Sequence, residues 1–164
     1  MVKEAANVAL QFNKARETGI IDLKGCGLME IPQALFFFVK EVEVTEIDIS
    51  DNQLKRVPLK LIKAFPKMIK LSIANNCLED LPDFSLYNLS HLKRVDFSNN
   101  KITKFPIGLP SSVEYINFSN NSLFYLNENE IQSIKNCKGD VNLENNKFNE
   151  DIKVMLLEKY KLNV

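Results

Sequence analysis

An eleven-residue pattern of apolar and polar positions recurs along the chain. Four copies read VTEIDISDNQL, MIKLSIANNCL, LKRVDFSNNKI and VEYINFSNNSL, each with apolar residues at positions 1, 4, 6 and 11. Positions 4 and 6 alternate with mostly polar residues at positions 5 and 7, which is typical of a strand with one buried face. We therefore predict one short strand in each copy.

Two further copies, TGIIDLKGCGL and KGDVNLENNKF, extend this pattern at either end. The residues at position 9 are spaced by 21 to 26 residues and form a ladder: Cys26, Asn52, Asn76, Asn100, Asn121 and Asn146. One such strand cannot bury its apolar face alone, so we expect the copies to stack into a parallel sheet. Each Asn amide would bond backbone groups of its own and the adjacent copy, with Cys26 as a small thiol in the same place. We therefore interpret the ladder as structural.

The pattern LxxLxLxx(N/C)xL at this spacing resembles the leucine-rich repeat family, over roughly residues 18–150. The order of an amphipathic helix, ETG and then IIDLKGCGLMEIP is similar to short animal members of that family. The resemblance implies an α/β fold: a right-handed solenoid of about six repeats. A curved parallel sheet would line its concave face, and short helices, turns or extended segments would form the convex face.

The segments between the predicted strands differ in character. EIPQALFFFVKEVEV and RVPLKLIKAFPK predict short helices or turns, and NENEIQSIKN predicts one or two helical turns. FPIGLPSSV is too rich in Pro and Gly for a helix, so we expect it to be extended. Phe36, Phe37 and Phe38 are consecutive and cannot all face one core. One alternative is that at least one of them is exposed; the favoured expectation is that a neighbouring coil or the N-terminal helix covers them.

Both ends of the chain carry amphipathic helical patterns. The apolar face near the N-terminus comprises Ala5, Val8, Ala9, Phe12 and Ala15, and the face after Asn149 comprises Ile152, Met155, Leu156 and Tyr160. We expect these helices to cap the terminal repeats. The predicted organisation is a single, complete domain over 1–164, with an N-terminal cap at 1–17, six repeats at 18–148 and a C-terminal cap at 149–164.

Composition limits the possible partners and the compartment. Lys and Arg together number 21, as do Asp and Glu, so no global field attracts nucleic acid or an anionic membrane. The three cysteines are widely spaced, which predicts neither a disulfide framework nor a zinc site. The first residues contain no long apolar run. We therefore expect an intracellular, cytoplasmic protein without a membrane partner.

Candidate catalytic residues are few. His91 is the single histidine and has no recognisable nucleophile motif beside it, which favours a surface or loop position. Cys137 lies next to lysines, but no matched base is visible. Nucleotide-binding and zinc-protease motifs are absent from the sequence. We predict that the chain is not an enzyme and uses no cofactor or metal.

The exposed side of the predicted sheet offers a partner-binding surface. Positions 3 and 5 of the four central repeats supply the candidate residues Glu46, Asp48, Lys70, Ser72, Arg94, Asp96, Tyr115 and Asn117. We expect an acidic patch of Glu46, Asp48 and Asp51, and a basic patch of Lys70, Lys93, Arg94 and Lys101. Small residues at position 7 would keep the face shallow. Arg94 and Tyr115 are the expected hot spots, because Arg and aromatic side chains are favoured interface anchors.

The family resemblance implies partners that are proteins. We therefore expect a monomeric, non-catalytic interaction module or adaptor that binds a protein through the concave face. Two alternatives stay open: a self-associating structural unit that uses an edge strand or the Phe36–Phe38 region, and a nucleic-acid-associated adaptor that uses the basic patch. A secreted effector is a third alternative, suggested by the LP-rich fifth repeat.

Overall fold

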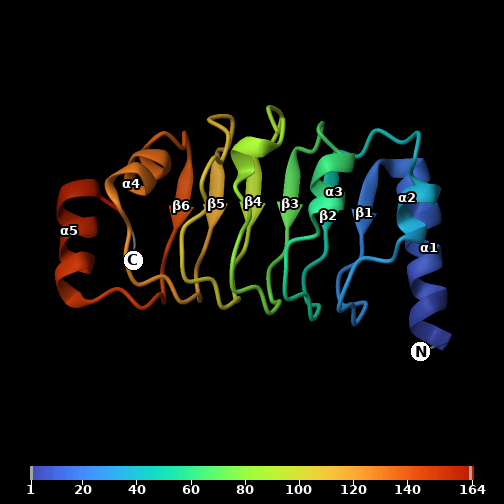
Figure 1. Cartoon of the computed structure of the whole chain (residues 1–164), viewed down its shortest axis with the longest axis horizontal. Helices are drawn as coiled ribbons and strands as arrows, with labels where there is room; N and C mark the ends of the chain where they lie inside the picture. The colour runs from blue at the N-terminus through green and yellow to red at the C-terminus, as the bar shows by residue number, and fades with distance from the viewer. Residues whose placement is uncertain (1, 163) are drawn as a thin grey trace.

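Six short strands form one parallel sheet in the order of the chain. The computed structural model describes residues 2–162 and 164, and at residues 2–7 it describes the helix backbone alone. The elements are α1 (Val2–Thr18), β1 (Ile20–Asp22), α2 (Ala34–Phe38), β2 (Glu46–Asp48), α3 (Leu59–Ala64), β3 (Lys70–Ser72), the 3-10 helix η1 (Phe84–Leu86), β4 (Arg94–Asp96), β5 (Tyr115–Asn117), α4 (Glu128–Lys135), β6 (Asp140–Asn142) and α5 (Glu150–Tyr160). Every strand pairs in parallel with the next one along the chain (Figure 1). This arrangement confirms the predicted solenoid.

Equivalent positions of successive coils lie opposite one another, and this register builds the core. Ile47 is aligned with Leu71, and Leu71 with Val95. All three side chains are buried, as are the apolar residues at position 6 of each coil. Aromatic rings of adjacent coils also pack together: the ring centroids of Phe97 and Phe118 are separated by 5.3 Å and their planes are tilted by 44°. Each strand thus buries its apolar face only because the next coil covers it.

The ladder asparagines connect each coil to the preceding one. The Oδ1 atom of Asn76 accepts a hydrogen bond from the Leu54 N–H at 2.9 Å, and its Nδ2 donates to the Ile49 carbonyl at 3.0 Å. Nδ2 also donates to the Ile73 and Ala74 carbonyls of its own coil. The same arrangement recurs at Asn52, Asn100, Asn121 and Asn146. One amide therefore satisfies backbone groups that would otherwise be buried without partners.

The residue before each ladder asparagine adopts left-handed backbone geometry. These residues are Asp51, Asn75, Asn99, Asn120 and Asn145, with φ between 53° and 58°. Asp and Asn tolerate this region better than other side chains do, because their short polar groups bond locally. The repeated FSNN therefore combines two roles: its first Asn makes the turn and its second Asn bonds the adjacent coil. The spacing of the repeats indicates the second role but not the first.

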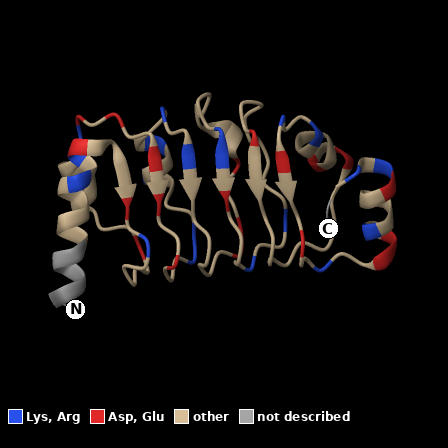
Figure 2. Cartoon of the chain, turned by 180° about the vertical axis from the view of Figure 1, so that it is seen from behind, with Lys and Arg blue, Asp and Glu red and all other residues tan. Residues whose placement is uncertain are grey.

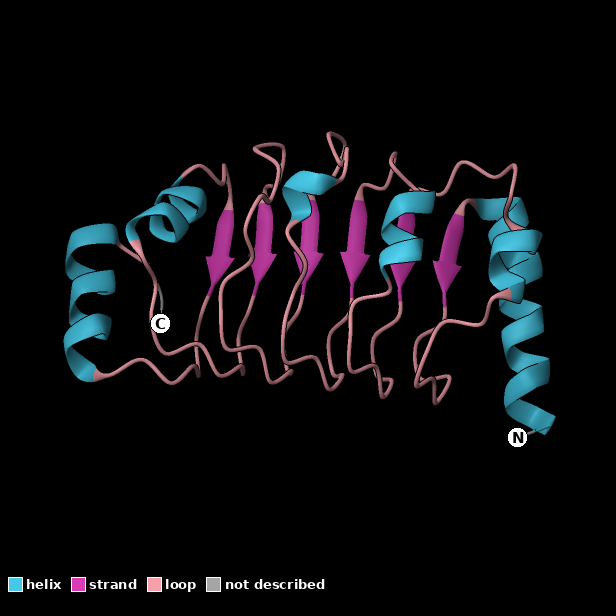
Figure 3. Ribbon diagram, viewed as in Figure 1, coloured by secondary structure: helices cyan, strands magenta, loops and turns pink. Residues whose placement is uncertain are grey.

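The segments behind the sheet agree with their predicted character. α2 and α3 lie in the two segments predicted to be helices or turns, and α4 lies in NENEIQSIKN. Figures 2 and 3 together show α3 and η1 on one side of the sheet, while the other side is left uncovered. The segment FPIGLPSSV contains no helix, as predicted. Gly108 within it has a φ of 74°, and a Cβ atom there would lie 2.2 Å from the Ser85 nitrogen of the preceding coil.

Helices stand at both ends of the sheet, α1 beside β1 and α5 beyond β6 (Figure 1). Val8, Phe12 and Ala15 of α1 are buried, whereas Ala9 is exposed; the side chain of Ala5 lies outside the described residues. In α5, Leu156 is buried, while Ile152, Met155 and Tyr160 are partly buried. The interpretation of both helices as caps of a single domain stays a prediction. Within the described residues, no helix combines the length and apolarity that crossing a bilayer requires.

The three consecutive phenylalanines are covered unequally, which corrects the expectation that all are covered. Phe36 is partly buried and stacks on Phe65, with 6.5 Å between the ring centroids. Phe38 lies against Phe12 of α1 at 5.5 Å and is 42% exposed. Phe37 is 82% exposed. The helix α2 is five residues long, and its buried residue is Leu35, so Phe37 points away from the core.

Replacing Asn76 with Ala should destabilise the fold by about 2–4 kcal/mol, because buried backbone groups of two coils lose their partners. Urea denaturation followed by circular dichroism measures this loss. Asn88→Ala is the control, since Asn88 is exposed and should change stability by less than about 0.5 kcal/mol. Equal effects of the two substitutions would contradict the structural role of the ladder.

Replacing Gly108 with Ala should cost more than about 1 kcal/mol, because a Cβ both strains the backbone and meets the Ser85 nitrogen. The matched control is Gly25→Ala, where φ is 63° but no atom lies within 4 Å of the added Cβ. The two free energies of unfolding, measured side by side, separate steric contact from backbone strain. If Gly108→Ala were as stable as Gly25→Ala, the contact between the added Cβ and the preceding coil would have no energetic cost.

Candidate functional site

The uncovered side of the sheet, here called the exposed sheet face, carries two rows of side chains. The first residue of each strand forms the leading row: Ile20, Glu46, Lys70, Arg94, Tyr115 and Asp140. The last residue of each strand forms the trailing row: Asp22, Asp48, Ser72, Asp96, Asn117 and Asn142. The parallel register places members of one row side by side. All eight predicted partner-binding residues therefore lie in these two rows, on β2 to β5.

The leading row is a chain of paired side chains across β2 to β5. The Lys70 Nζ lies 3.6 Å from the Glu46 Oε2. The Arg94 guanidinium lies over the Tyr115 ring, 4.9 Å from the ring centroid, as a cation–π contact. Figure 2 shows the resulting sequence of charge, with acidic residues at the start of β2 and β6 and basic residues at the start of β3 and β4. The row thus presents charge, an aromatic ring and a guanidinium together.

The trailing row has a structural role in addition to the predicted partner-binding role. The Asp96 Oδ1 accepts hydrogen bonds from the Ser98 N–H at 2.9 Å and the Ser98 hydroxyl at 2.7 Å. Asp48 accepts the same two bonds from Ser50. Asn117 accepts one from the Ser119 N–H. The signal in the sequence was the Asp or Asn at position 5 with Ser at position 7, a spacing at which a side chain caps its own backbone turn. These side chains are held before any partner arrives.

Two expectations about this face need correction. Ser72, one of the predicted partner-binding residues, is only 9% exposed and offers little surface to a partner. The small residues at position 7 are buried as well: Ser50, Ala74, Ser98 and Ser119. They lie at the point where the chain turns inward after the strand, so they do not form the expected shallow surface. The surface consists of the larger side chains of the two rows.

Pairing between coils neutralises part of the predicted acidic and basic patches, at Asp51, Glu46, Lys70 and Lys93. The Asp51 carboxylate lies 3.4 Å from the Lys24 ammonium group, and the Glu46 carboxylate lies 3.6 Å from that of Lys70. The Lys93 ammonium hydrogen-bonds the Glu114 carboxylate at 2.5 Å, and this bond, with the positive charge of Lys93, holds the pKa of Glu114 below its usual value. Nucleic-acid binding needs uncompensated cations along the surface. Of the basic patch, Arg94 and Lys101 form no ion pair within the described residues. Two such cations give little support to the nucleic-acid alternative.

The candidate catalytic residues lack an activating environment. His91 is exposed in the turn before β4. Burial raises the pKa of the Cys137 thiol, so the neighbouring lysines do not make it a ready nucleophile. Burial, and then the nearby Asp22 carboxylate, raise the pKa of Cys26. Among the described residues, no three His, Cys, Asp or Glu side chains are grouped so as to hold a metal ion.

Comparisons with known proteins agree with this architecture. A family model described as leucine-rich repeats in two copies matches residues 66–111. Podocan of Mus musculus is 28% identical over 130 residues, which are 78% of this chain and 20% of podocan. An adenylate cyclase of Schizosaccharomyces pombe is 29% identical over 116 residues, which are 68% of this chain but 7% of the cyclase. This chain therefore spans a small part of these relatives, and the activity of the cyclase does not come with the match.

The solved structures give the same fold. The crystal structure of the BIR2 ectodomain from Arabidopsis thaliana is similar with a TM-score of 0.57 and 20% identity, covering 78% of this chain and 67% of that one. At this identity the likeness concerns the fold alone. Leucine-rich repeat proteins are in general protein–protein interaction modules. The parallel sheet, the asparagine ladder and these likenesses together show that the chain is a leucine-rich repeat protein.

Proposed function

We propose that this chain is a non-catalytic interaction module that binds a protein partner through the exposed sheet face. The observation that carries the proposal is the contact between Arg94 and Tyr115 in the centre of the leading row. Arg and Tyr, together with Trp, are enriched among the residues that contribute most of the binding energy of interfaces. Here they lie side by side on a face that no helix covers (Figure 2).

Two of the side chains around this pair already have partners within the chain, which favours binding. Asp96 is held by Ser98 and accepts a further bond from the Asn117 amide at 3.4 Å, and Lys70 is held by Glu46. Association costs conformational entropy for every side chain that must be immobilised. A surface whose groups are fixed by strands and neighbouring coils loses less on binding than a set of free side chains would.

The charge of the leading row indicates the complementary partner surface. Glu46 stands at one side of the central pair, and Asp140 at the other end of the row. A partner that places a carboxylate near Arg94 and a cation near Glu46 would match this order.

We further propose that the module acts as a monomer in the cytoplasm. Its odd number of widely spaced cysteines suits a reducing compartment.

The test uses the double variant Arg94→Glu/Tyr115→Ala in a quantitative capture experiment from lysate of the cells that express the protein. A genuine partner of the exposed sheet face should lose at least about tenfold in capture by the variant. The partner is then confirmed with purified proteins by isothermal titration calorimetry. Circular dichroism verifies that the double variant remains folded.

A matched control carries the same kinds of substitution away from the strands, as Lys104→Glu/Tyr125→Ala. Lys104 and Tyr125 are both exposed and lie in the segments that follow β4 and β5. This control should capture the partner as the unmodified chain does. A partner retained by Arg94→Glu/Tyr115→Ala would overturn the assignment of the binding face.

A further inference from the structure

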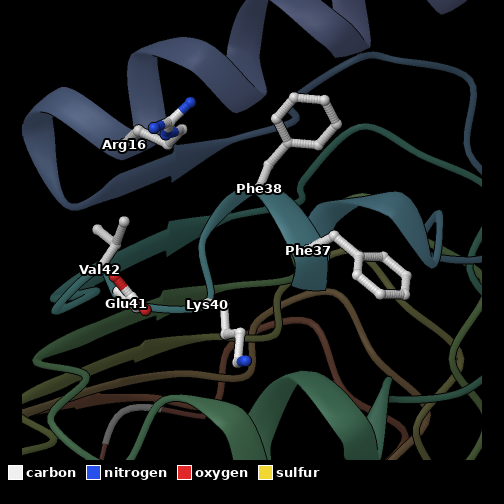
Figure 4. A pocket seen from close by; sticks show the side chains of 6 residues that line it. All are labelled: Arg16, Phe37, Phe38, Lys40, Glu41 and Val42. Carbon is white, nitrogen blue, oxygen red and sulfur yellow. The ribbon is translucent and has the colours of Figure 1, made fainter.

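Two adjoining pockets surround the short helix α2, on segments that do not contribute to the exposed sheet face. One, of about 350 Å³, lies between α2 and α3 and has an apolar floor that includes Phe36, Val39 and Phe65. The other, of about 480 Å³, lies between α2 and α1 (Figure 4). Lys40 and Val42 line both pockets, and the two adjoining pockets together are here called the α2 groove.

The floor of the α2 groove is fixed by the core beneath it. Leu35 is fully buried and anchors α2, and the Phe36 ring stacks on the Phe65 ring. Phe37 stands beside this floor and is 82% exposed, the largest exposed fraction among the large apolar side chains of the described residues. In Figure 4, Phe37 and Phe38 point in different directions from α2, with Phe38 turned toward α1. The groove thus offers apolar surface that no part of the described chain covers.

The rim of the α2 groove is positively charged, although the chain as a whole is neutral. Arg16, Lys40, Lys60 and Lys63 line the two pockets, against a single acidic residue, Glu41. The pocket between α2 and α3 has three lysines and no carboxylate in its lining. This differs from the leading row, where Lys70 is paired with the acidic Glu46.

None of these four cations forms an ion pair within the described residues. The Lys60 Nζ lies 4.4 Å from the centroid of the Phe36 ring and donates a hydrogen bond to the Gln33 Oε1. The Lys63 Nζ lies 6.0 Å from the centroid of the Tyr87 ring. The Lys60 and Lys63 ammonium groups therefore lie over aromatic rings, and neither is ion-paired with a carboxylate of the described residues.

We propose that the α2 groove binds an acidic peptide segment of a protein partner. An aromatic or aliphatic side chain of that segment would pack against Phe36, Phe37 and Phe65, and flanking Asp or Glu side chains would bond Lys40, Lys60 and Lys63. The charge of the rim selects acidic residues, and the recessed floor selects one protruding apolar anchor. A lipid surface fits less well, because insertion into a bilayer needs a broad protruding apolar face. This surface is separate from the exposed sheet face and does not depend on it.

Panning of a phage-displayed library of random dodecapeptides against the purified chain tests the proposal. The enriched peptides should carry Asp or Glu on both sides of an aromatic or aliphatic residue. Their affinity, measured by fluorescence polarisation with the synthetic peptide, should fall by about tenfold or more in Lys40→Gln/Lys60→Gln/Lys63→Gln. Phe37→Ala should weaken binding as well. Because it removes no charge, the dependence of the affinity on salt concentration should stay that of the unmodified chain.

The matched control removes three other lysines, as Lys101→Gln/Lys104→Gln/Lys147→Gln, which are exposed and lie outside the α2 groove. It has the same net charge as the groove variant and should bind the peptide as the unmodified chain does. Equal loss in both variants, or enriched peptides without acidic residues, would overturn the proposal. Sedimentation with vesicles of phosphatidylcholine and phosphatidylserine, and the mass in solution at rising concentration, complete the test. Binding to the vesicles or dimerisation that requires the three groove lysines, with no acidic peptide enriched, would assign the surface to lipid or to a second copy instead.

Discussion

The side-chain amide of the ladder asparagine is the interaction on which the rest of this structure depends. Each coil turns inward after its strand, and this turn brings backbone N–H and C=O groups into an apolar interior. The amide of Asn76 satisfies four of them, three as donor and one as acceptor, in two coils at once. Without it, either the turn would have to open to water or the coils would have to separate, and both would remove the cover of the core.

The same interaction determines what the exposed sheet face can be. Fixing the distance between coils fixes the strand register, at a separation of about 4.8 Å. At that separation, residues at one repeat position become neighbours although they are far apart in sequence. Lys70 therefore meets Glu46, and Arg94 meets Tyr115. The contacts of the leading row follow from which residues occupy one position in successive repeats, whereas Asp48 and Asp96 of the trailing row are held by serines two residues further along the chain.

This explains how much could be predicted from the sequence. The strands, the ladder and the helical segments depend on patterns within about one repeat, and the residues show them directly. The burial of Ser72 and the exposure of Phe37 depend instead on how each coil turns against its neighbours, which the pattern of apolar positions does not specify. The acidic and basic patches follow from the charges of the residues at each repeat position. Whether a charge is neutralised depends on its partner in the adjacent coil, such as Glu114 for Lys93. Compositional patches in a solenoid should therefore be evaluated across coils.

The asparagine ladder also has a direction. Every ladder amide donates to a carbonyl of the preceding coil, which lies 24 to 29 residues earlier in the chain. A coil is therefore completed by the coil that follows it. The first coil has Cys26 at this position, and the Cys26 Sγ contacts the Lys24 carbonyl of its own coil at 3.7 Å. As the chain leaves the ribosome, each turn can close as soon as the next has emerged, so that the solenoid can assemble vectorially with the polypeptide behind it still unsynthesised.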